Sequence, residues 1–115
     1  MTKQVPHTVT SECAVERVLA VLKDHWSMLI LRDLLEKDKP MRFNELKRSL
    51  HPISAKILAE RLAGLVEAGI VKRTVYPETP VRVEYSLAEK GRALNDVFEE
   101  IRAWGEKWMP VEATS

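Results

Sequence analysis

The chain has only one cysteine, Cys13, and its three histidines are scattered. A lone cysteine excludes a disulfide within the chain and suits a reducing compartment. The histidines have no metal-ligand spacing among themselves or to the cysteine, and the four glycines form no phosphate-binding loop. Because no group of nucleophile, base and metal ligands is present, we predict that the protein is not an enzyme and needs no cofactor or metal.

Long apolar runs are missing as well. No run of 18 apolar residues occurs, so no membrane span is expected. The polar segment 1–11 lacks the apolar centre of a signal peptide, and we expect a cytoplasmic protein. With 115 residues, 45% of them apolar, the chain should form one domain that is short enough to gain from oligomerisation. We predict a flexible arm over 1–11, a folded domain over 12–109 and a tail over 110–115.

The net charge is only +1, but it is unevenly distributed. Residues 42–82 hold eight basic and four acidic side chains, whereas 1–41 hold six of each and 83–115 hold four basic and seven acidic. Local field rather than total charge attracts phosphates, so the middle segment is a candidate for nucleic-acid binding. An ordinary solvated surface could show the same asymmetry.

The middle segment has the pattern of a helix-turn-helix. Apolar residues recur at helical spacing over 43–50, and Pro52 disfavours helical geometry at the residue before it. Ser54 stands where the next helix needs an N-cap. Ile53 and Leu58 fit a hydrophobic staple that would fix the angle between the two helices.

A β-hairpin should follow this second helix. Gly69 is a helix C-terminal signal, and the segment 70–76 is the expected first strand. In 81–87, Val81, Val83, Tyr85 and Leu87 alternate with polar residues, which predicts a strand with one buried face. The prolines in 77–80 favour a stiff, extended tip rather than a tight two-residue turn.

Further helices should flank this unit. One should begin near Cys13 and be interrupted at residues 24–25, and 26–35 should form a buried central helix followed by a loop over 36–40. Ser86 and Glu89 have the spacing of a capping box, which predicts the start of a last helix that ends before Pro110.

The last helix carries apolar residues at alternating spacings of three and four, the pattern of a helix–helix seam. This seam could pack on its own domain. We favour a two-fold dimer, because two tryptophans near a chain end are more than an unpartnered helix would expose. The predicted dimer-interface residues are Val15, Val18, Leu94, Val97, Ile101, Trp104 and Trp108.

A winged helix-turn-helix inserts the start of its second helix into the major groove of DNA. Small side chains there permit close approach to bases, and basic residues nearby reach phosphates or a minor groove. Each of these positions could also be a solvated polar position. The predicted DNA-binding residues are Arg42, Arg48, Ser54, Ala55, Lys56, Ala59, Arg61 and Arg82.

Cys13 stands at the expected start of the first helix. Amide dipoles at that end and Arg17 one turn on would favour a thiolate, which suits a sensor of oxidants or electrophiles. The alternative is a small capping or half-buried residue.

Five segments resemble the HxlR-type transcriptional regulators, winged-helix relatives of the MarR group. They are CAVE (13–16), WSMLILR (26–32), RFNEL (42–46), ISAKIL (53–58) and VEYSLAEKG (83–91). The resemblance covers about residues 12–108 in the same order. It implies dimeric DNA-binding regulators of the bacterial cytosol whose first and last helices make the dimer contacts.

The resemblance also implies that Cys13 matches a cysteine that senses oxidants or electrophiles in several members. The chain differs in having Ala14 where the family often has proline, which loosens the preset helix start and with it the reason for a thiolate. It also has Asp24-His25 where Gly-Lys is common. With one cysteine, any disulfide would have to join two subunits or a small thiol.

The predicted fold is α+β and mainly α, a winged helix-turn-helix with a two-stranded β-wing and N- and C-terminal dimerisation helices. The predicted function is that of a homodimeric regulator that binds double-stranded DNA at a palindromic operator and possesses a candidate sensor in Cys13. Two alternatives remain open, a winged-helix module that binds proteins and a small-molecule-responsive regulator without cysteine sensing.

Overall fold

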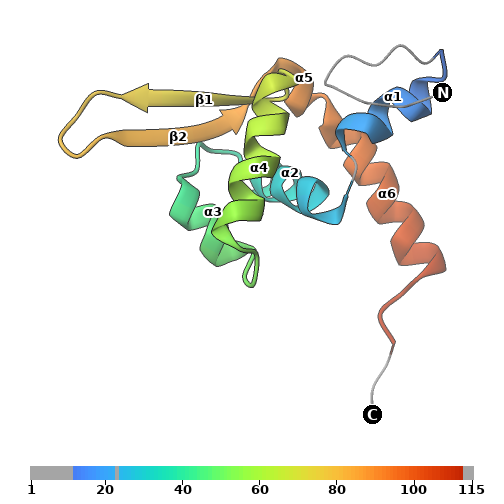
Figure 1. Ribbon diagram of the computed structural model, residues 1–115. Coiled ribbons are helices and arrows are strands. Elements are labelled where there is room, and N and C mark those ends of the chain that lie inside the picture. Colours follow the sequence, from blue (N-terminus) through green and yellow to red (C-terminus); the bar gives the residue numbers. More distant parts are fainter. Residues whose placement is uncertain (1–11, 23, 113–115) are drawn as a thin grey trace.

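The computed structural model describes residues 12–22 and 24–112, which form six helices and one two-stranded hairpin (Figure 1). The elements are α1 (Ala14–Val21), α2 (His25–Lys37), α3 (Phe43–Ser49), α4 (Ala55–Glu67), β1 (Val71–Tyr76), β2 (Arg82–Leu87), α5 (Glu89–Arg92) and α6 (Leu94–Trp108). This confirms the predicted fold, a mainly helical chain with a β-wing. The expected arm 1–11 lies outside the described residues, and 110–112 follow α6 without regular structure.

The hydrophobic core lies where α2 packs against α3, α4 and the base of the hairpin. The predicted central helix is confirmed as α2, which runs two residues past its expected end. Burying one aliphatic side chain fully contributes about 1.5–3 kcal/mol to folding. The largest fully buried side chains are Ile30, Leu31, Leu34, Leu46, Leu58, Leu62, Leu65 and Val71.

Local signals fix both ends of α4 as expected. The Oγ atom of Ser54 accepts a hydrogen bond from the backbone N–H of Ile57 at 3.1 Å, so Ser54 is the N-cap. At the other end Gly69 has a φ of +78°, a conformation that glycine adopts at no steric cost. The N–H groups of Gly69 and Ile70 bond back to the carbonyls of Val66 and Leu65, the Schellman arrangement.

The hairpin is an antiparallel pair that extends beyond the helices as a wing (Figure 1). Its register runs from Val71 opposite Leu87 at the base to Tyr76 opposite Arg82 near the tip. The expected buried strand face is wrong, because only Leu87 in β2 is buried and Val81 is 62% exposed. No layer of the described residues covers the outer wing, so its alternating pattern does not produce burial.

The last helix does not begin at the predicted capping box. Ser86 is still in β2, where it pairs with Lys72, and α5 begins at Glu89 with Ala88 as its N-cap and no side-chain cap. Ser86, which the local sequence predicts to be a helix cap, is therefore part of the strand pair instead. A one-turn helix, α5, then leads through Ala93 into α6.

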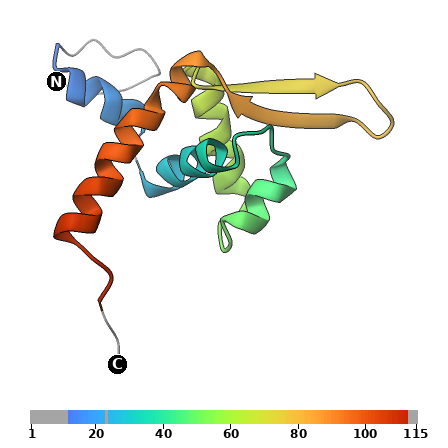
Figure 2. The same ribbon diagram turned by 180° about the vertical axis from the view of Figure 1, so that it is seen from behind.

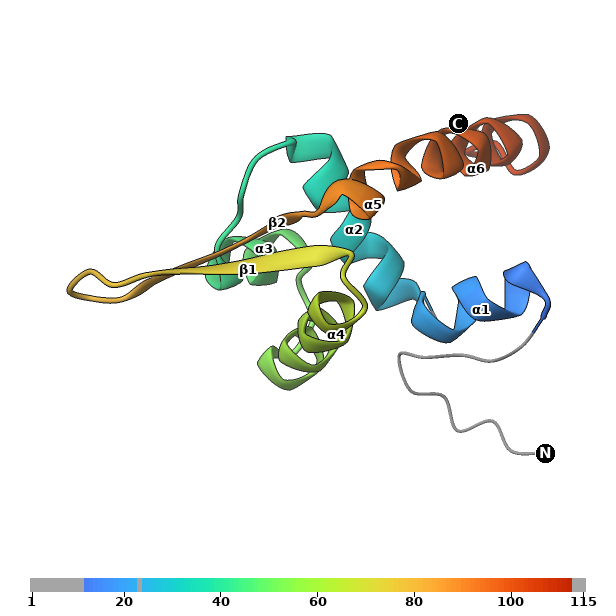
Figure 3. The same ribbon diagram turned by 90° about the horizontal axis from the view of Figure 1, so that it is seen from above.

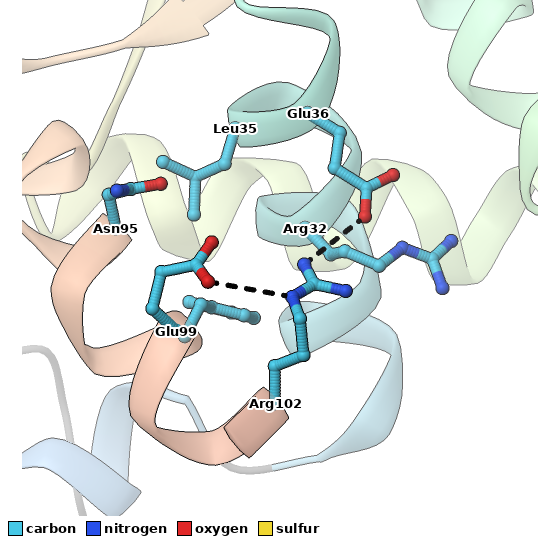
Figure 4. A pocket seen from close by; sticks show the side chains of 7 residues that line it. Arg32, Leu35, Glu36, Asn95, Glu99 and Arg102 are labelled. Carbon is cyan, nitrogen blue, oxygen red and sulfur yellow. Dashed lines mark hydrogen bonds and ion pairs between the residues drawn. The ribbon is translucent and has the colours of Figure 1, made fainter. Parts of the chain in front are cut away.

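One side of α6 packs on the domain, and Leu94 and Phe98 contact the core cluster. Figure 4 shows Arg102 of α6 reaching from Glu99 on its own helix toward Glu36 on α2, with N–O distances of 3.8 and 3.5 Å. These exposed pairs lie at the rim of a hollow of about 150 Å³ between the two helices.

Helices α1 and α6 both lie on the side of the molecule opposite the wing (Figures 1 and 2), and the view from above agrees (Figure 3). Neither helix has a buried residue. None of the helices in the described parts of the chain is long and apolar enough to cross a membrane.

Candidate nucleic-acid interface

The start of α4 presents the small and polar residues that sequence reasoning assigned to base contacts. Ser54, Ala55, Lys56 and Ala59 are all exposed. They surround the first turn of a helix whose other face, with Leu58 and Leu62, is buried in the core. This end of α4 therefore stands on a rigid support and is open to a partner.

A groove of about 570 Å³ separates the start of α3 from the wing. Three of the predicted DNA-binding arginines, Arg42, Arg48 and Arg82, line it together. They come from two elements more than thirty residues apart, and folding brings them to one place. In Figure 1, α3 lies between the wing and the turn that leads into α4, so the exposed start of α4 lies beyond α3 from the wing.

The α3 side of the groove has a cationic excess. The main-chain N–H of Arg42 donates to Glu45 Oε1 at 2.8 Å. That bond lowers the pKa of Glu45 against the opposing effect of desolvation, and Lys39, Arg48 and Arg42 lower it further by their charge. Within residues 12–22 and 24–112, no carboxylate forms an ion pair with the guanidinium of Arg42 or Arg48. Both are therefore available to a phosphate.

Arg82, on the wing side of the groove, has carboxylate partners instead. Its Nη2 lies 2.8 Å from Glu78 Oε2 and its Nη1 lies 2.7 Å from Glu84 Oε2. Its guanidinium carbon also lies 3.7 Å from the centre of the Tyr76 ring. Hydrogen bonds to Glu78 and Glu84 raise the pKa of Arg82, and the bond from Arg82 lowers the pKa of Glu78.

The contacts of these two glutamates with Arg82 were not predicted from the sequence. A signal for Glu84 was present, because residues two apart on a strand share a face, which brings Glu84 beside Arg82. Glu78 lies at the wing tip, and a non-regular loop gives no periodicity from which its position could be predicted.

Arg61 has a structural partner that was not predicted from the sequence. Its Nη2 lies 2.7 Å from Asp24 Oδ2, and its Nε donates to the same oxygen at 2.7 Å. The carboxylate of Asp24 is the N-cap of α2, since it also accepts the N–H of Ser27 at 3.0 Å. The sequence predicts that Arg61 contacts a phosphate. In the structure its guanidinium joins α4 to the N-cap of α2. We therefore leave Arg61 out of the proposed interface.

The predicted dimer residues lie away from the groove, on α1 and α6. Six of them are among the exposed large apolar side chains: Val15 (64%), Val18 (50%), Val97 (47%), Ile101 (51%), Trp104 (59%) and Trp108 (62%). The seventh, Leu94, is half-buried against the core. Exposure of this many apolar groups on two helices is unusual for a surface that stays in water.

Cys13 is the N-cap residue of α1, with extended backbone and an exposed side chain, and it makes no side-chain capping hydrogen bond. The predicted start of the first helix is thus confirmed. A cleft of about 320 Å³ runs beside this helix, between α1 and the residues that follow α4 and begin α6. Its apolar lining includes Val18, Ile70 and Leu94, with Arg17 and Lys90 also present.

Comparison with known proteins identifies the group to which this geometry belongs. The family model for the HxlR-like helix-turn-helix matches residues 21–113. The chain belongs to the HxlR-like helix-turn-helix family. The resemblance drawn from the sequence motifs is therefore confirmed, and the protein is a transcriptional regulator of the helix-turn-helix type.

Among the relatives of this HxlR-like chain is the HTH-type transcriptional regulator YodB from Bacillus subtilis. It is 45% identical over 94 residues, 82% of each chain. The solved structure of its reduced form has a TM-score of 0.76 at 42% identity and covers 89% of this chain and all of that one.

Two further structures confirm the fold. A protein from Porphyromonas gingivalis W83, described as a MarR-family transcriptional regulator, has a TM-score of 0.78 at 32% identity, over 89% of this chain and 98% of that one. The redox regulator HypR in its oxidized form has a TM-score of 0.76 at 36% identity, over 86% of this chain and all of that one.

Proposed function

We propose that this HxlR-like regulator is a bacterial, cytoplasmic homodimer that binds a palindromic operator and thereby alters transcription. The observation that supports the proposal best is the exposed start of α4 on a rigid support, together with the cationic groove between α3 and the wing. The start of α4 enters the major groove, where Ser54, Ala55, Lys56 and Ala59 face bases. Arg42 and Arg48 bind phosphates on one side, and Arg82 binds on the wing side.

In a dimer, the second subunit contacts the second half-site of the operator. The exposed apolar residues of α1 and α6 are covered by the same residues of a second copy, as a two-fold interface requires. Because these helices lie opposite the wing, the dimer leaves both wings and both α4 starts exposed. Two equal half-sites about 10 base pairs apart then explain why the operator is palindromic.

Binding to DNA is tested directly with a duplex enriched from a random-sequence library by the wild-type protein. Log affinity should fall linearly with log salt, with a slope of about 0.9 for each phosphate neutralised. Lys56→Ala should weaken binding roughly fivefold or more, because a base or phosphate contact is lost. Lys37→Ala, at the exposed end of α2, is the matched control and should change little.

If the wild-type protein does not bind the duplex at any salt concentration, the alternative of a winged-helix module that binds proteins gains support. Unchanged affinity of Lys56→Ala together with Arg42→Ala would reject the docking of α4 and the groove, even if the protein binds DNA elsewhere.

The finer proposal is that Cys13 senses oxidants or electrophiles. Its support is its exposed position at the start of α1, on a helix assigned to the dimer interface, and the redox role stated for the related HypR. We expect oxidation with diamide to change duplex affinity of the wild type and not of Cys13→Ser. An equal response in the variant would show that Cys13 is not the sensor.

A small-molecule-responsive regulator is the second candidate, and the cleft beside α1 favours it. Its apolar floor and two basic residues suit a small amphipathic anion, which would act on the same helix. A change of affinity with a ligand that persists in Cys13→Ser would identify this mode.

A further inference from the structure

Arg82 is the most completely engaged side chain of the candidate interface. Glu78 takes two of its donors, Nη2 at 2.8 Å and Nε at 3.3 Å, and Glu84 takes Nη1 at 2.7 Å. Tyr76, its partner across the wing, stacks on the guanidinium. We call Glu78 and Glu84 the Arg82 clasp. An arginine has five N–H donors, and the clasp therefore uses at least three of them.

The clasp reverses the local charge that DNA would meet. One guanidinium between two carboxylates makes a group of net charge −1, whereas the α3 side of the groove presents Arg42 and Arg48 without such partners. The bonds from Arg82 to the glutamates are of the kind that it would donate to a phosphate. Phosphate and clasp therefore compete for these three donors, and both carboxylates repel the phosphate.

We propose that Glu78 and Glu84 restrain DNA affinity by holding Arg82 on the wing, so that Arg82 can offer its full set of donors to a phosphate only when the clasp opens. This inference rests on the proposed DNA-binding function and adds two acidic residues that set its strength. Arg42 and Arg48 contact phosphates whether the clasp is open or closed. Arg82 adds only the difference between its interaction free energy with a phosphate and that with the two carboxylates.

A double-mutant cycle on the enriched duplex tests the clasp. The four proteins are wild type, Glu78→Gln, Arg82→Ala and the double variant. We expect Glu78→Gln to bind roughly two- to fivefold tighter than the wild type, the size of one exposed ion pair. In the Arg82→Ala background the same change should give a smaller gain, because only the repulsion between Glu78 and the phosphates is then removed. Glu100→Gln, on exposed α6, is the control for the change in net charge alone.

Two further readouts complete the test. Glu84→Gln should repeat the result, and it keeps the test usable if Glu78→Gln fails to fold. Arg82→Ala should weaken binding more in the Glu78→Gln background than in the wild type, because DNA must open the clasp of the wild-type protein before it gains Arg82.

Different results would overturn the proposal. An equal gain from Glu78→Gln in both backgrounds would mean that Glu78 only repels DNA. Weaker binding of Glu78→Gln would mean that the clasp positions Arg82 for DNA rather than restraining it. If the wild type bound no duplex, the proposed function itself would fail and the clasp with it, whereas failure of the cycle alone would leave that function intact.

Discussion

Asp24 has two partners that lie far apart in the sequence. One carboxylate oxygen caps the start of α2 through Ser27, and the other receives the guanidinium of Arg61 from α4. Its side chain is 28% exposed and that of Arg61 is 24% exposed, so solvent screens the pair only in part. The residue therefore ties the start of the central helix to the helix that we assign to the major groove.

Replacing Asp24 should separate these two contributions. Asp24→Ala removes both and should lower the free energy of unfolding by about 1–2 kcal/mol, the range for a lost N-cap. Asp24→Asn keeps a capping oxygen and should cost less, under about 1 kcal/mol, because only the charged pair with Arg61 is weakened. Urea denaturation measures both, with Asp96→Ala on exposed α6 as control. Equal losses in the two variants would show that the cap contributes little.

The pH dependence of that stability has a definite sign. Burial alone would raise the pKa of Asp24, but the N–H of Ser27 and the charge of Arg61 together lower it below its ordinary value. A folded-state pKa below the unfolded value of about 3.9 contributes stability above that pH. The loss caused by Asp24→Ala should be full at neutral pH and should shrink as pH falls through the folded-state pKa. A loss that is constant down to about pH 2 would contradict this.

Sequence spacing predicts some of these residues and not others. The cap at Ser54 could be predicted because its partner is three residues away, within one turn of helix. The pair of Arg61 with Asp24 spans 37 residues and depends on how α2 and α4 pack, so no local pattern contains it. Arg82 was assigned to the interface by its charge and its position beside the wing tip, and neither reveals which neighbours a side chain already has.

At the scale of elements, the junction between β2 and α5 is closely packed. Gly91 is buried, and a side-chain carbon placed on it would collide with the main-chain oxygen of Ile70 and touch Leu87. That oxygen also accepts the N–H of Ala88, which joins the start of α5 to the end of α4. The absent side chain lets the one-turn helix dock directly on the base of the wing.

Gly91→Ala should therefore lower the free energy of unfolding by about 1–3 kcal/mol, the cost of overpacking a filled site. Gly64→Ala is a matched control in α4, where nothing lies within 4 Å of the added carbon. It should raise stability by roughly 0.5–1 kcal/mol, because alanine is the better helix former. Thermal unfolding measures both, and a stable Gly91→Ala protein would show that α5 can shift away from Ile70.

The element order followed from periodicity, but the start of the last helix did not. Ser86 and Glu89 match a capping box as a local pattern, yet Ser86 pairs with Lys72 across the hairpin. Long-range strand pairing determines the conformation of Ser86, and a local sequence pattern contains no information about that pairing. For the wing, the strand was predicted correctly but its buried face was not. Burial of one face needs a second layer, and none of the described residues forms such a layer over the protruding hairpin.

At the scale of the whole molecule, two kinds of surface lie on opposite sides. The wing and α3, which line the groove, lie at one side, and α1 and α6 lie at the other (Figures 1 and 3). The exposed apolar residues of the predicted interface belong to α1 and α6. The apolar spacing of α6 predicted a helix–helix seam. In the structure Val97, Ile101, Trp104 and Trp108 are exposed, whereas Leu94 packs against the core of its own domain. A sequence cannot choose between an intramolecular and an intermolecular cover, because both produce the same spacing.

A pair of valines of equal exposure tests the dimer that we propose. Val97 on α6 and Val75 on β1 are each 47% exposed, but only Val97 lies in the predicted interface. An aspartate at Val97 would be buried without a counter-charge in each protomer, which costs on the order of 3 kcal/mol and weakens association roughly a hundredfold. Val97→Asp should therefore sediment as a monomer, whereas Val75→Asp should stay dimeric.

The same pair links assembly to DNA binding. A monomer holds one α4 and one wing, so Val97→Asp should bind the enriched duplex with about half the wild-type salt slope, since half as many phosphates are neutralised. Val75→Asp keeps both half-site contacts and should retain a slope near that of the wild type. If Val97→Asp remained dimeric with an unchanged slope, the interface would have to lie elsewhere, and the apolar residues of α6 would need another partner.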